Sequence, residues 1–201
     1  MFVIVRHGNT FGPGEPPRRI GARTDLPLTA QGEAQALALG EHFAGLGWRF
    51  TRALVSPLLR TRDTARLILA TQPEPPVAQT CEWLREIDHG PDEDRSEAEV
   101  LARIGPQALE AWDTRAEVPD GWLVEPAMRR AGWAALFAGE EPGPTLVVTS
   151  NGAARFALLA EPALAAAMPS LSSLKLPTGG YGVIRRAADR TLAVEEWGRR
   201  P

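Results

Sequence analysis

The sequence predicts an α/β fold, a three-layer α/β/α sandwich built on a largely parallel central sheet. Short β-prone runs such as Phe2–Val5 and Thr145–Thr149 alternate with longer segments in which apolar residues have helical spacing, and this alternation is typical of layered domains. The 201 residues contain 44% hydrophobic side chains, which is enough for one substantial core. We therefore expect residues 1–201 to form a single domain.

The first half of the chain is expected to alternate strands and helices. The expected elements are a strand at Phe2–Val5, a Gly- and Pro-rich loop at 11–22, a helix that runs to about Leu46, a strand at Arg52–Val55, a helix that runs to about Ala70 and a short strand near Val77–Thr80. Thr29 and Ser56 are the expected N-caps of the two helices, and Pro57 suits a first helical position. Ala34 and Ala38 are expected on the buried face of the first helix.

The second half is expected to continue this alternation. The expected elements are helices at Arg95–Trp112 and Pro126–Ala138, a strand at Thr145–Thr149, a helix from about Gly152 to Leu159, and strands at Gly182–Arg186 and Thr191–Trp197. Leu101, Ile104 and Ala108 have the helical spacing that indicates the first of these helices. Because ligands of open α/β sheets bind beyond the carboxyl ends of the strands, side chains that directly follow a strand are site candidates.

Composition excludes several classes of partner. The formal net charge is −3 and the arginines are scattered, so no basic face for nucleic acid or an anionic membrane is indicated. No apolar run is long enough for a signal-peptide core or a membrane span, and we expect a soluble cytoplasmic protein. The single cysteine, Cys81, excludes an intrachain disulfide. No Cys, His and carboxylate residues have metal-ligand spacing, so we expect no metal and no cofactor.

The segment Arg6-His7-Gly8 directly follows the first expected strand. A neutral imidazole can attack phosphorus, and an adjacent guanidinium both holds a phosphoryl group and favours the neutral imidazole. Gly8 has no side chain that would keep a ligand away from the backbone. Taken alone, the three residues are better explained by a solvated Arg-His pair in a turn. Further motifs are needed to choose between these interpretations.

Three segments together resemble the histidine phosphatase superfamily, the phosphoglycerate mutase-like proteins. They are Arg6-His7-Gly8-Asn9-Thr10, the run Gly21-Ala22-Arg23-Thr24-Asp25-Leu26-Pro27-Leu28-Thr29, and Ser56-Pro57 followed by Arg60-Thr61 and Thr64-Ala65. They occur in the order of the family and at similar spacing, and the resemblance returns at Leu146–Arg155. It implies a phosphoglycerate mutase-like fold in which the histidine of the first motif becomes phosphorylated.

The resemblance also implies a role for each matching residue. His7 would be the nucleophile, while Arg6 and Arg60 would hold phosphoryl oxygens, which planar guanidinium groups can bind in pairs. Glu86 stands four residues before a glycine, as the acid of the family does, and would protonate the leaving oxygen. Asp88, two residues further along, is the alternative acid.

Two positions depart from the family pattern. Relatives carry a second histidine after the strand that follows the variable middle, but this chain has Ser150 there, followed by Asn151. Both side chains can give hydrogen bonds to phosphate, and backbone N–H groups at the start of the next helix can add to them. A proline replaces an asparagine that contacts phosphate in many relatives, and Asn9 could partly substitute for it. His89 is a further candidate to replace the missing imidazole.

The expected function is hydrolysis of small phosphomonoesters through a phosphohistidine on His7, without a metal or cofactor. Turnover would be slow because Ser150 supplies no imidazole cation. A non-catalytic protein that binds a phosphorylated ligand is the alternative, and it is motivated by the same serine. A phosphomutase is less favoured, since no long insertion that would retain an intermediate is evident. A serine hydrolase is disfavoured, because Ser-Asn-Gly does not match a G-x-S-x-G elbow.

Overall fold

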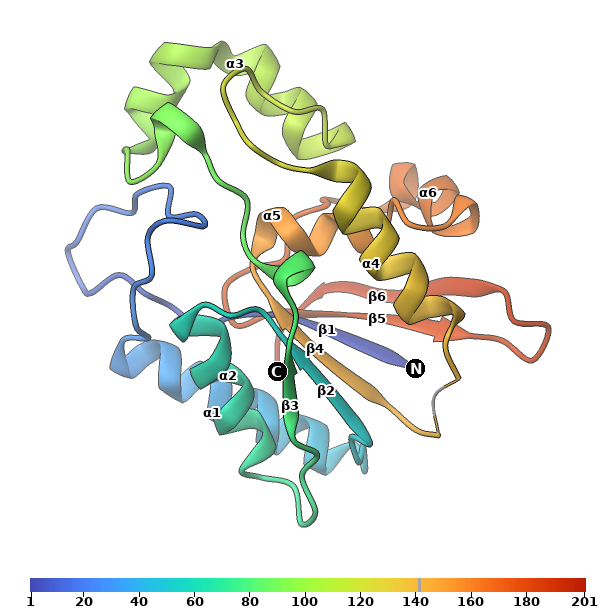
Figure 1. Cartoon of the computed structure of the whole chain (residues 1–201). Coiled ribbons are helices and arrows are strands. Elements are labelled where there is room, and N and C mark those ends of the chain that lie inside the picture. The colour runs from blue at the N-terminus through green and yellow to red at the C-terminus, as the bar shows by residue number, and fades with distance from the viewer. Residues whose placement is uncertain (141) are drawn as a thin grey trace.

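The computed structural model describes residues 1–140 and 142–201 and contains a six-stranded sheet (Figure 1). Its strands are β1 (Phe2–Arg6), β2 (Arg52–Val55), β3 (Ala78–Thr80), β4 (Thr145–Thr149), β5 (Tyr181–Arg186) and β6 (Leu192–Arg199). The spatial order is β3-β2-β4-β1-β5-β6. The first four strands in this order are parallel, whereas β5 is antiparallel to β1, and β6 to β5. The predicted largely parallel central sheet is confirmed.

Helices cover both faces of the sheet and complete the three layers (Figure 1). Their bounds are α1 (Ala30–Gly45), α2 (Leu59–Leu69), α3 (Glu97–Arg115), α4 (Pro126–Ala138), α5 (Asn151–Ala154) and α6 (Pro162–Ala167), with short 3₁₀ helices η1 (Glu82–Leu84), η2 (Gly90–Asp92), η3 (Arg155–Ala157) and η4 (Met168–Ser170). α1 and α2 pack against each other on one face, and α4, α5 and α6 lie on the other. α3 lies farther from the sheet than the other helices.

Two apolar cores lie on opposite faces of the sheet, because successive strand side chains point in opposite directions. In β1, Val3 and Val5 are fully buried in the cluster on the side of α1 and α2. Phe2 and Ile4 are fully buried in the cluster on the side of α4. Burial of each such side chain stabilises the fold by roughly 1.5–3 kcal/mol. The strand that leads into the Arg6-His7-Gly8 segment is therefore held from both sides.

The carboxyl ends of β1 and β4 meet at one edge of the sheet. Arg6 pairs with Thr149, and the His7 N–H donates to the Thr149 carbonyl oxygen at 3.1 Å. The Thr149 hydroxyl donates to the Leu84 carbonyl oxygen at 2.6 Å, which fixes the end of η1 at the same place. Three segments that carry candidate site residues are thus brought together.

The buried face of α1 is not the predicted one. Ala34 and Ala38 are exposed. The buried residues are instead Gly32, Ala36, Leu39, Gly40 and Phe43. The physical reason is a close contact with the loop after β1, where a Cβ on Gly32 would lie 2.2 Å from the Asn9 carbonyl oxygen. The predicted Thr29 cap is confirmed, since its hydroxyl accepts the Gly32 N–H at 3.2 Å.

Two other helices differ from prediction at their ends. α2 begins at Leu59, and its N-cap Leu58 makes no side-chain hydrogen bond, so Ser56 and Pro57 precede the helix. Arg60 still lies in its first turn. After β4, the expected continuous helix is the single turn α5 followed by η3, because hydrogen bonds there tighten to the 3₁₀ pattern.

Candidate active site

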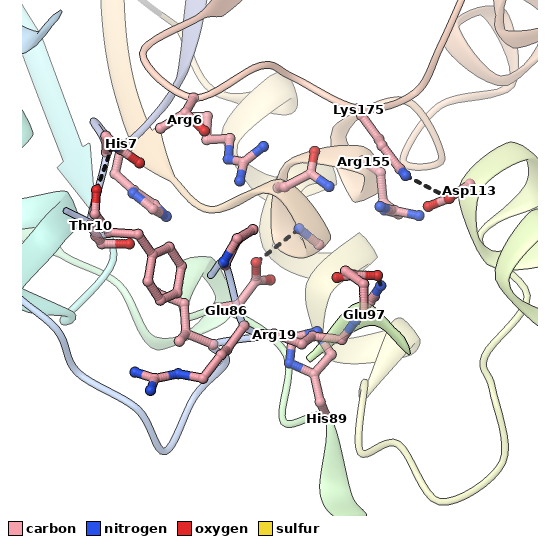
Figure 2. Close-up of a pocket in the computed structure, with 18 of the residues that line it drawn as sticks. Arg6, His7, Thr10, Arg19, Glu86, His89, Glu97, Asp113, Arg155 and Lys175 are labelled. Carbon is pink, nitrogen blue, oxygen red and sulfur yellow. Dashed lines mark hydrogen bonds and ion pairs between the residues drawn. The ribbon is translucent and has the colours of Figure 1, made fainter. Parts of the chain in front are cut away.

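A cavity of about 500 Å³ lies at the edge where β1 and β4 end. The lining residues used below are Arg6, His7 and Asn9 after β1, Arg19 in the first loop, Glu86 and His89 after η1, Trp112 and Asp113 in α3, Asn151 and Arg155 after β4, and Lys175 before β5. Figure 2 shows these segments converging around one space. A cavity of this size accommodates a small-molecule ligand.

His7 is a neutral imidazole with a fixed ring proton. Its Nδ1 lies 2.7 Å from the Gly8 carbonyl oxygen, and because a carbonyl oxygen only accepts hydrogen bonds, this contact places the proton on Nδ1. Burial lowers the pKa of His7 well below 6.5, and the charges of Arg60 and Arg6 lower it further. The ring is therefore neutral at pH 7, with the lone pair of Nε2 available for nucleophilic attack.

The two predicted phosphate-binding arginines are held in different ways. Arg6 lines the cavity, and its Nη1 donates to the Leu176 carbonyl oxygen at 2.9 Å. Arg60 is fully buried and is not among the residues that line the cavity; its Nη1 and Nη2 donate to the carbonyl oxygens of Thr24 at 2.7 Å and Gly21 at 3.1 Å. The Nε of each arginine is buried and has no hydrogen-bond partner among the described residues. Each guanidinium thus has a buried Nε–H without a partner, but only Arg6 is among the residues that line the cavity.

The carboxylate of Glu86 is fixed by three backbone N–H groups. Its Oε1 accepts from Ile87 at 2.9 Å and from Ala153 at 3.1 Å, and its Oε2 accepts from Gly152 at 3.1 Å. A Cβ at Gly152 would lie 2.4 Å from Oε1, so this close approach requires glycine. Figure 2 shows the Glu86 carboxylate within the cavity. Its position suits proton transfer to or from a ligand there.

Asp88, the alternative acid, is placed outside the cavity lining. Its Oδ1 accepts the Gly90 N–H at 2.7 Å and the Arg23 Nε–H at 3.1 Å. The carboxylate is therefore engaged in a turn and a surface ion pair. The geometry favours Glu86 over Asp88 as the acid.

Ser150 is fully buried and is not among the residues that line the cavity. Its Oγ has no hydrogen-bond partner in the part of the chain that the structure describes. Asn151 does line the cavity, and its Oδ1 accepts the Leu176 N–H at 3.0 Å. The backbone N–H groups at the start of the next helix were expected to be available to phosphate. Those of Gly152 and Ala153 already donate to the Glu86 carboxylate. A Ser150 contact with phosphate therefore stays a prediction, whereas Asn151 is placed to make one.

His89 and Asn9, the other two candidates, both line the cavity. The His89 ring packs edge-to-face on Trp122 at 4.7 Å, and its Nδ1 lies 3.4 Å from Glu93 Oε2. Burial opposes the ionisation of Glu93, but hydrogen bonds from His89, a threonine and backbone N–H groups lower its pKa to about 2. His89 thus lies against an ionised carboxylate. The Asn9 amide donates to the Phe11 carbonyl oxygen at 2.8 Å, which orients the loop after β1.

The wall across from His7 contains residues that no sequence motif individually assigned to the site (Figure 2). They are Arg19, Glu97, Trp112, Asp113, Arg155 and Lys175. Arg155 is fully buried, and its guanidinium carbon lies 4.0 Å from the centre of the Trp112 ring. Most of this wall comes from α3 and from loops in which no motif is recognisable. The one available signal was Arg155, which ends the last segment that resembles the family.

The described residues show neither a group of metal ligands nor a membrane-spanning helix. None of their His, Cys, Asp and Glu side chains form a group of three or more that could hold a metal ion. No helix within residues 1–140 and 142–201 combines the length and the apolar character needed to cross a membrane.

The fold is an α/β sandwich with a cavity at the carboxyl ends of its central strands, and comparison with known proteins identifies the family. The model of the histidine phosphatase superfamily (branch 1) matches residues 2–198. The chain therefore belongs to the histidine phosphatase superfamily, as the motifs predicted. It is 33% identical over 168 residues to a 2,3-bisphosphoglycerate-dependent phosphoglycerate mutase 2 of Gloeobacter violaceus, covering 80% of this chain and 74% of that protein.

Other similar proteins include a second phosphoglycerate mutase and two phosphatases. A probable phosphoglycerate mutase of Salmonella arizonae is 39% identical over 97 residues, which cover 45% of this chain and 39% of that protein. A mycobacterial glucosyl-3-phosphoglycerate phosphatase has a similar structure, with a TM-score of 0.78, 21% identity, and 100% and 99% of the two chains covered. An alpha-ribazole phosphatase from Shigella flexneri gives a TM-score of 0.73 at 21% identity, with 98% and 96% covered. At these identities the structural likeness shows the fold alone.

Proposed function

We propose that this protein hydrolyses small phosphomonoesters through a phosphohistidine formed on His7. The observation that carries the proposal is the state of His7, a neutral ring whose Nδ1 lies 2.7 Å from the Gly8 carbonyl oxygen. The same cavity contains Arg6 and Glu86, which suit phosphate binding and proton transfer. The proposal includes a single domain over residues 1–201, a small phosphorylated substrate, cofactor-independent turnover and the cytoplasmic location expected from the sequence.

In the first step, the phosphoryl oxygens lie against Arg6, and the buried Arg60 adds its positive charge. The lone pair of His7 Nε2 forms the N–P bond while the bond from phosphorus to the leaving oxygen breaks. Glu86 gives its proton to that oxygen, so the product leaves as an alcohol. The Nδ1–H bond to the Gly8 carbonyl keeps the ring oriented as positive charge develops on it.

In the second step, a water molecule replaces the alcohol. Glu86 takes a proton from the water, whose oxygen attacks phosphorus. The N–P bond breaks and its electron pair returns to Nε2 of His7, which releases inorganic phosphate. One carboxyl group thus serves as acid and then as base, and the site returns to its starting state.

A phosphate-binding protein without turnover is the second candidate, favoured by Ser150 alone. This serine supplies no cation, and its Oγ is buried away from the cavity lining. The same arginines would hold the ligand, but no N–P bond would form.

Hydrolysis of p-nitrophenyl phosphate in the presence of a chelator tests the proposal. We expect turnover that His7→Ala abolishes, and an acid-labile, base-stable phosphoryl group on His7 after rapid quenching. His42→Ala is the matched control, because His42 is half-buried in α1 and bonded to the Tyr181 hydroxyl at 2.9 Å. Wild-type activity that survives His7→Ala, or no activity on a broad panel of phosphomonoesters, would favour the binding protein. Activity that a chelator removes and zinc or magnesium restores would contradict cofactor independence.

A further inference from the structure

Arg129 in α4 is a buried cation that contacts the backbone of the proposed acid. Its side chain is only 3% exposed. Nη1 donates to the carbonyl oxygens of Trp83, at 3.3 Å, and of Arg85, and Nη2 donates to that of Glu86 at 3.5 Å. Nε donates to the Val124 carbonyl oxygen at 2.6 Å. One side chain therefore ties α4 to three carbonyl groups at and just before Glu86.

The backbone at the end of η1 depends on side chains for its hydrogen bonds. Of the four consecutive carbonyl groups at 83–86, three accept from Arg129, and that of Leu84 accepts from the Thr149 hydroxyl. No loop or turn N–H of residues 1–140 and 142–201 donates to any of the four. Buried backbone carbonyl groups are nearly always paired, so this backbone would have to find new partners, and to shift, without Arg129.

The two ends of Glu86 are thus held by different helices. Its carboxylate accepts the N–H groups of Gly152 and Ala153 in α5, whereas its carbonyl oxygen accepts from Arg129 in α4. Figure 2 shows the carboxylate within the cavity. Because the side chain connects the two ends, a shift of the backbone moves the carboxylate relative to a ligand at His7.

A guanidinium suits this contact better than other donors. Its N–H groups lie in one plane at fixed angles and can bind several carbonyl oxygens at once, whereas an ammonium is a point charge on a flexible stem. Burial lowers the pKa of Arg129, and the negative charge of Glu86 is the largest effect that opposes this. The cation therefore acts on Glu86 through its charge as well as through the backbone.

A second contact between α4 and η1 does not involve Arg129. Gly132 lies so close to Trp83 that a Cβ there would be 2.4 Å from the ring. One turn further along, Trp133, Leu136 and Phe137 are buried in the core on this side of the sheet. Helix α4 is therefore seated independently, and a substitution at position 129 should leave it in place.

We propose that Arg129 is a positioning residue of the active site, which holds the backbone at Glu86 so that the carboxyl group meets the leaving oxygen. This role rests on the proposed hydrolysis at His7 and adds to it a residue outside the cavity lining. Because Arg129 does not contact the substrate, its effect on the rate should depend on Glu86. The effect should be largest for substrates whose leaving oxygen most needs a proton.

Two aryl phosphates of similar shape separate this role from a general support of the site. Phenol is a more basic leaving group than p-nitrophenol, so proton donation contributes more to the cleavage of phenyl phosphate than of p-nitrophenyl phosphate. The ratio kcat/KM reports the steps up to departure of the leaving group. We expect Arg129→Gln to lower kcat/KM by roughly 10–100-fold for phenyl phosphate, and by at least threefold less for p-nitrophenyl phosphate.

A matched control and a double variant assign the effect to Glu86. Arg130→Gln is the control, because Arg130 is the next residue of α4 and is exposed, and it should change each kcat/KM less than twofold. In a Glu86→Gln background, Arg129→Gln should cost less than a further twofold, since the acid that it positions is already absent. Equal losses on the two substrates, or an undiminished loss in the double variant, would overturn the proposal.

Thermal unfolding of each variant separates loss of the fold from loss of the role. Arg129→Lys keeps the charge and part of the donor set, so it should recover part of the rate, most clearly on phenyl phosphate. If Arg129→Gln does not fold, Arg129→Lys is compared with the wild type on the same two substrates. If neither variant folds, Arg129 serves the fold alone and the proposal is rejected.

Failure of this inference is distinguishable from failure of the proposed function. A wild type that hydrolyses neither aryl phosphate, nor any other phosphomonoester of a broad panel, would reject the proposed function and the role of Arg129 with it. A wild type that hydrolyses both, with folded Arg129 variants that lose equally on both, would overturn the role of Arg129 alone.

Discussion

Replacing Gly152 with alanine should disable catalysis while leaving the fold intact. The new Cβ would lie 2.4 Å from Glu86 Oε1, so the carboxylate must move by roughly 1 Å to reach an ordinary van der Waals separation. The atom that must move is the end of a flexible side chain, and Gly152 lies in α5, where alanine is the better helix former. A misplacement approaching 1 Å can cost about 10²-fold in rate. We expect a loss of that size in kcat.

The assay is kcat on p-nitrophenyl phosphate, with thermal unfolding measured on the same samples. Gly45→Ala is the matched control, because a Cβ at Gly45 meets nothing within 4 Å. It should leave kcat unchanged. Glu86→Gln should lose roughly 10²–10⁴-fold, the usual contribution of a general acid. If Gly152→Ala acts through Glu86, the double variant should be hardly slower than Glu86→Gln alone.

Two results would refute this reasoning. Wild-type kcat in a folded Gly152→Ala variant would show that the position of the Glu86 carboxylate does not limit the reaction. Losses that multiply in the double variant would show that Gly152 acts on something other than Glu86, such as a direct contact of its N–H with phosphate.

Three more predictions follow from the site. Ser150→His should raise kcat by about tenfold or more if the missing imidazole limits turnover, because one charge-stabilising group is typically worth 10²–10³-fold; an unchanged kcat would reject that explanation. Burial holds the pKa of His7 well below 6.5, so its protonation should reduce kcat/KM only below pH 6.5. A fall in kcat/KM on the acid side of the pH profile that is centred above pH 6.5 would contradict a buried neutral ring. Arg60→Ala should weaken competitive inhibition by phosphate by roughly 1.5–3 kcal/mol, and unchanged inhibition in a folded variant would remove Arg60 from the site.

Protonation of His7 should also lower the free energy of unfolding as the pH falls. The pKa of His7 is lower in the folded state than the unfolded value of 6.5, so the unfolded chain binds the proton more readily. The associated loss of stability therefore begins as the pH falls through 6.5 and grows until the folded-state pKa is reached. The acid side of the stability profile should become shallower in His7→Ala, as measured by chemical unfolding between pH 4 and pH 8.

Most of the sheet could be predicted because strands carry their signal locally. The runs around Phe2–Val5, Arg52–Val55 and Thr145–Thr149 are β-prone and directly precede motif residues, and the structure confirms all three. The face of α1 could not be predicted in this way. Alanine at positions 34 and 38 suggested an apolar stripe, whereas the decisive contact is that of Gly32 with a backbone distant in sequence.

The site residues likewise include some that local sequence motifs predict and others that depend on contacts distant in sequence. His7, Arg6 and Glu86 could be predicted from short motifs, and the structure brings them into one cavity. Trp112 and Asp113 could not, because nothing in the sequence of α3 shows which of its faces meets the ends of β1 and β4. The placement of Ser150 was also beyond the sequence, since residue type alone does not show that its Oγ is buried outside the cavity lining.

The serine at position 150 bears on the choice between an enzyme and a binding protein. Loss of one charge-stabilising group costs about 10²–10³ in rate, and this cost applies to every substrate. His7, Arg6 and Glu86 all line the cavity, so the nucleophile, a phosphate-binding cation and the proposed acid remain in place. Slow hydrolysis of p-nitrophenyl phosphate that His7→Ala abolishes is therefore the pattern that identifies an enzyme, whereas phosphate binding without any hydrolysis would identify a binding protein.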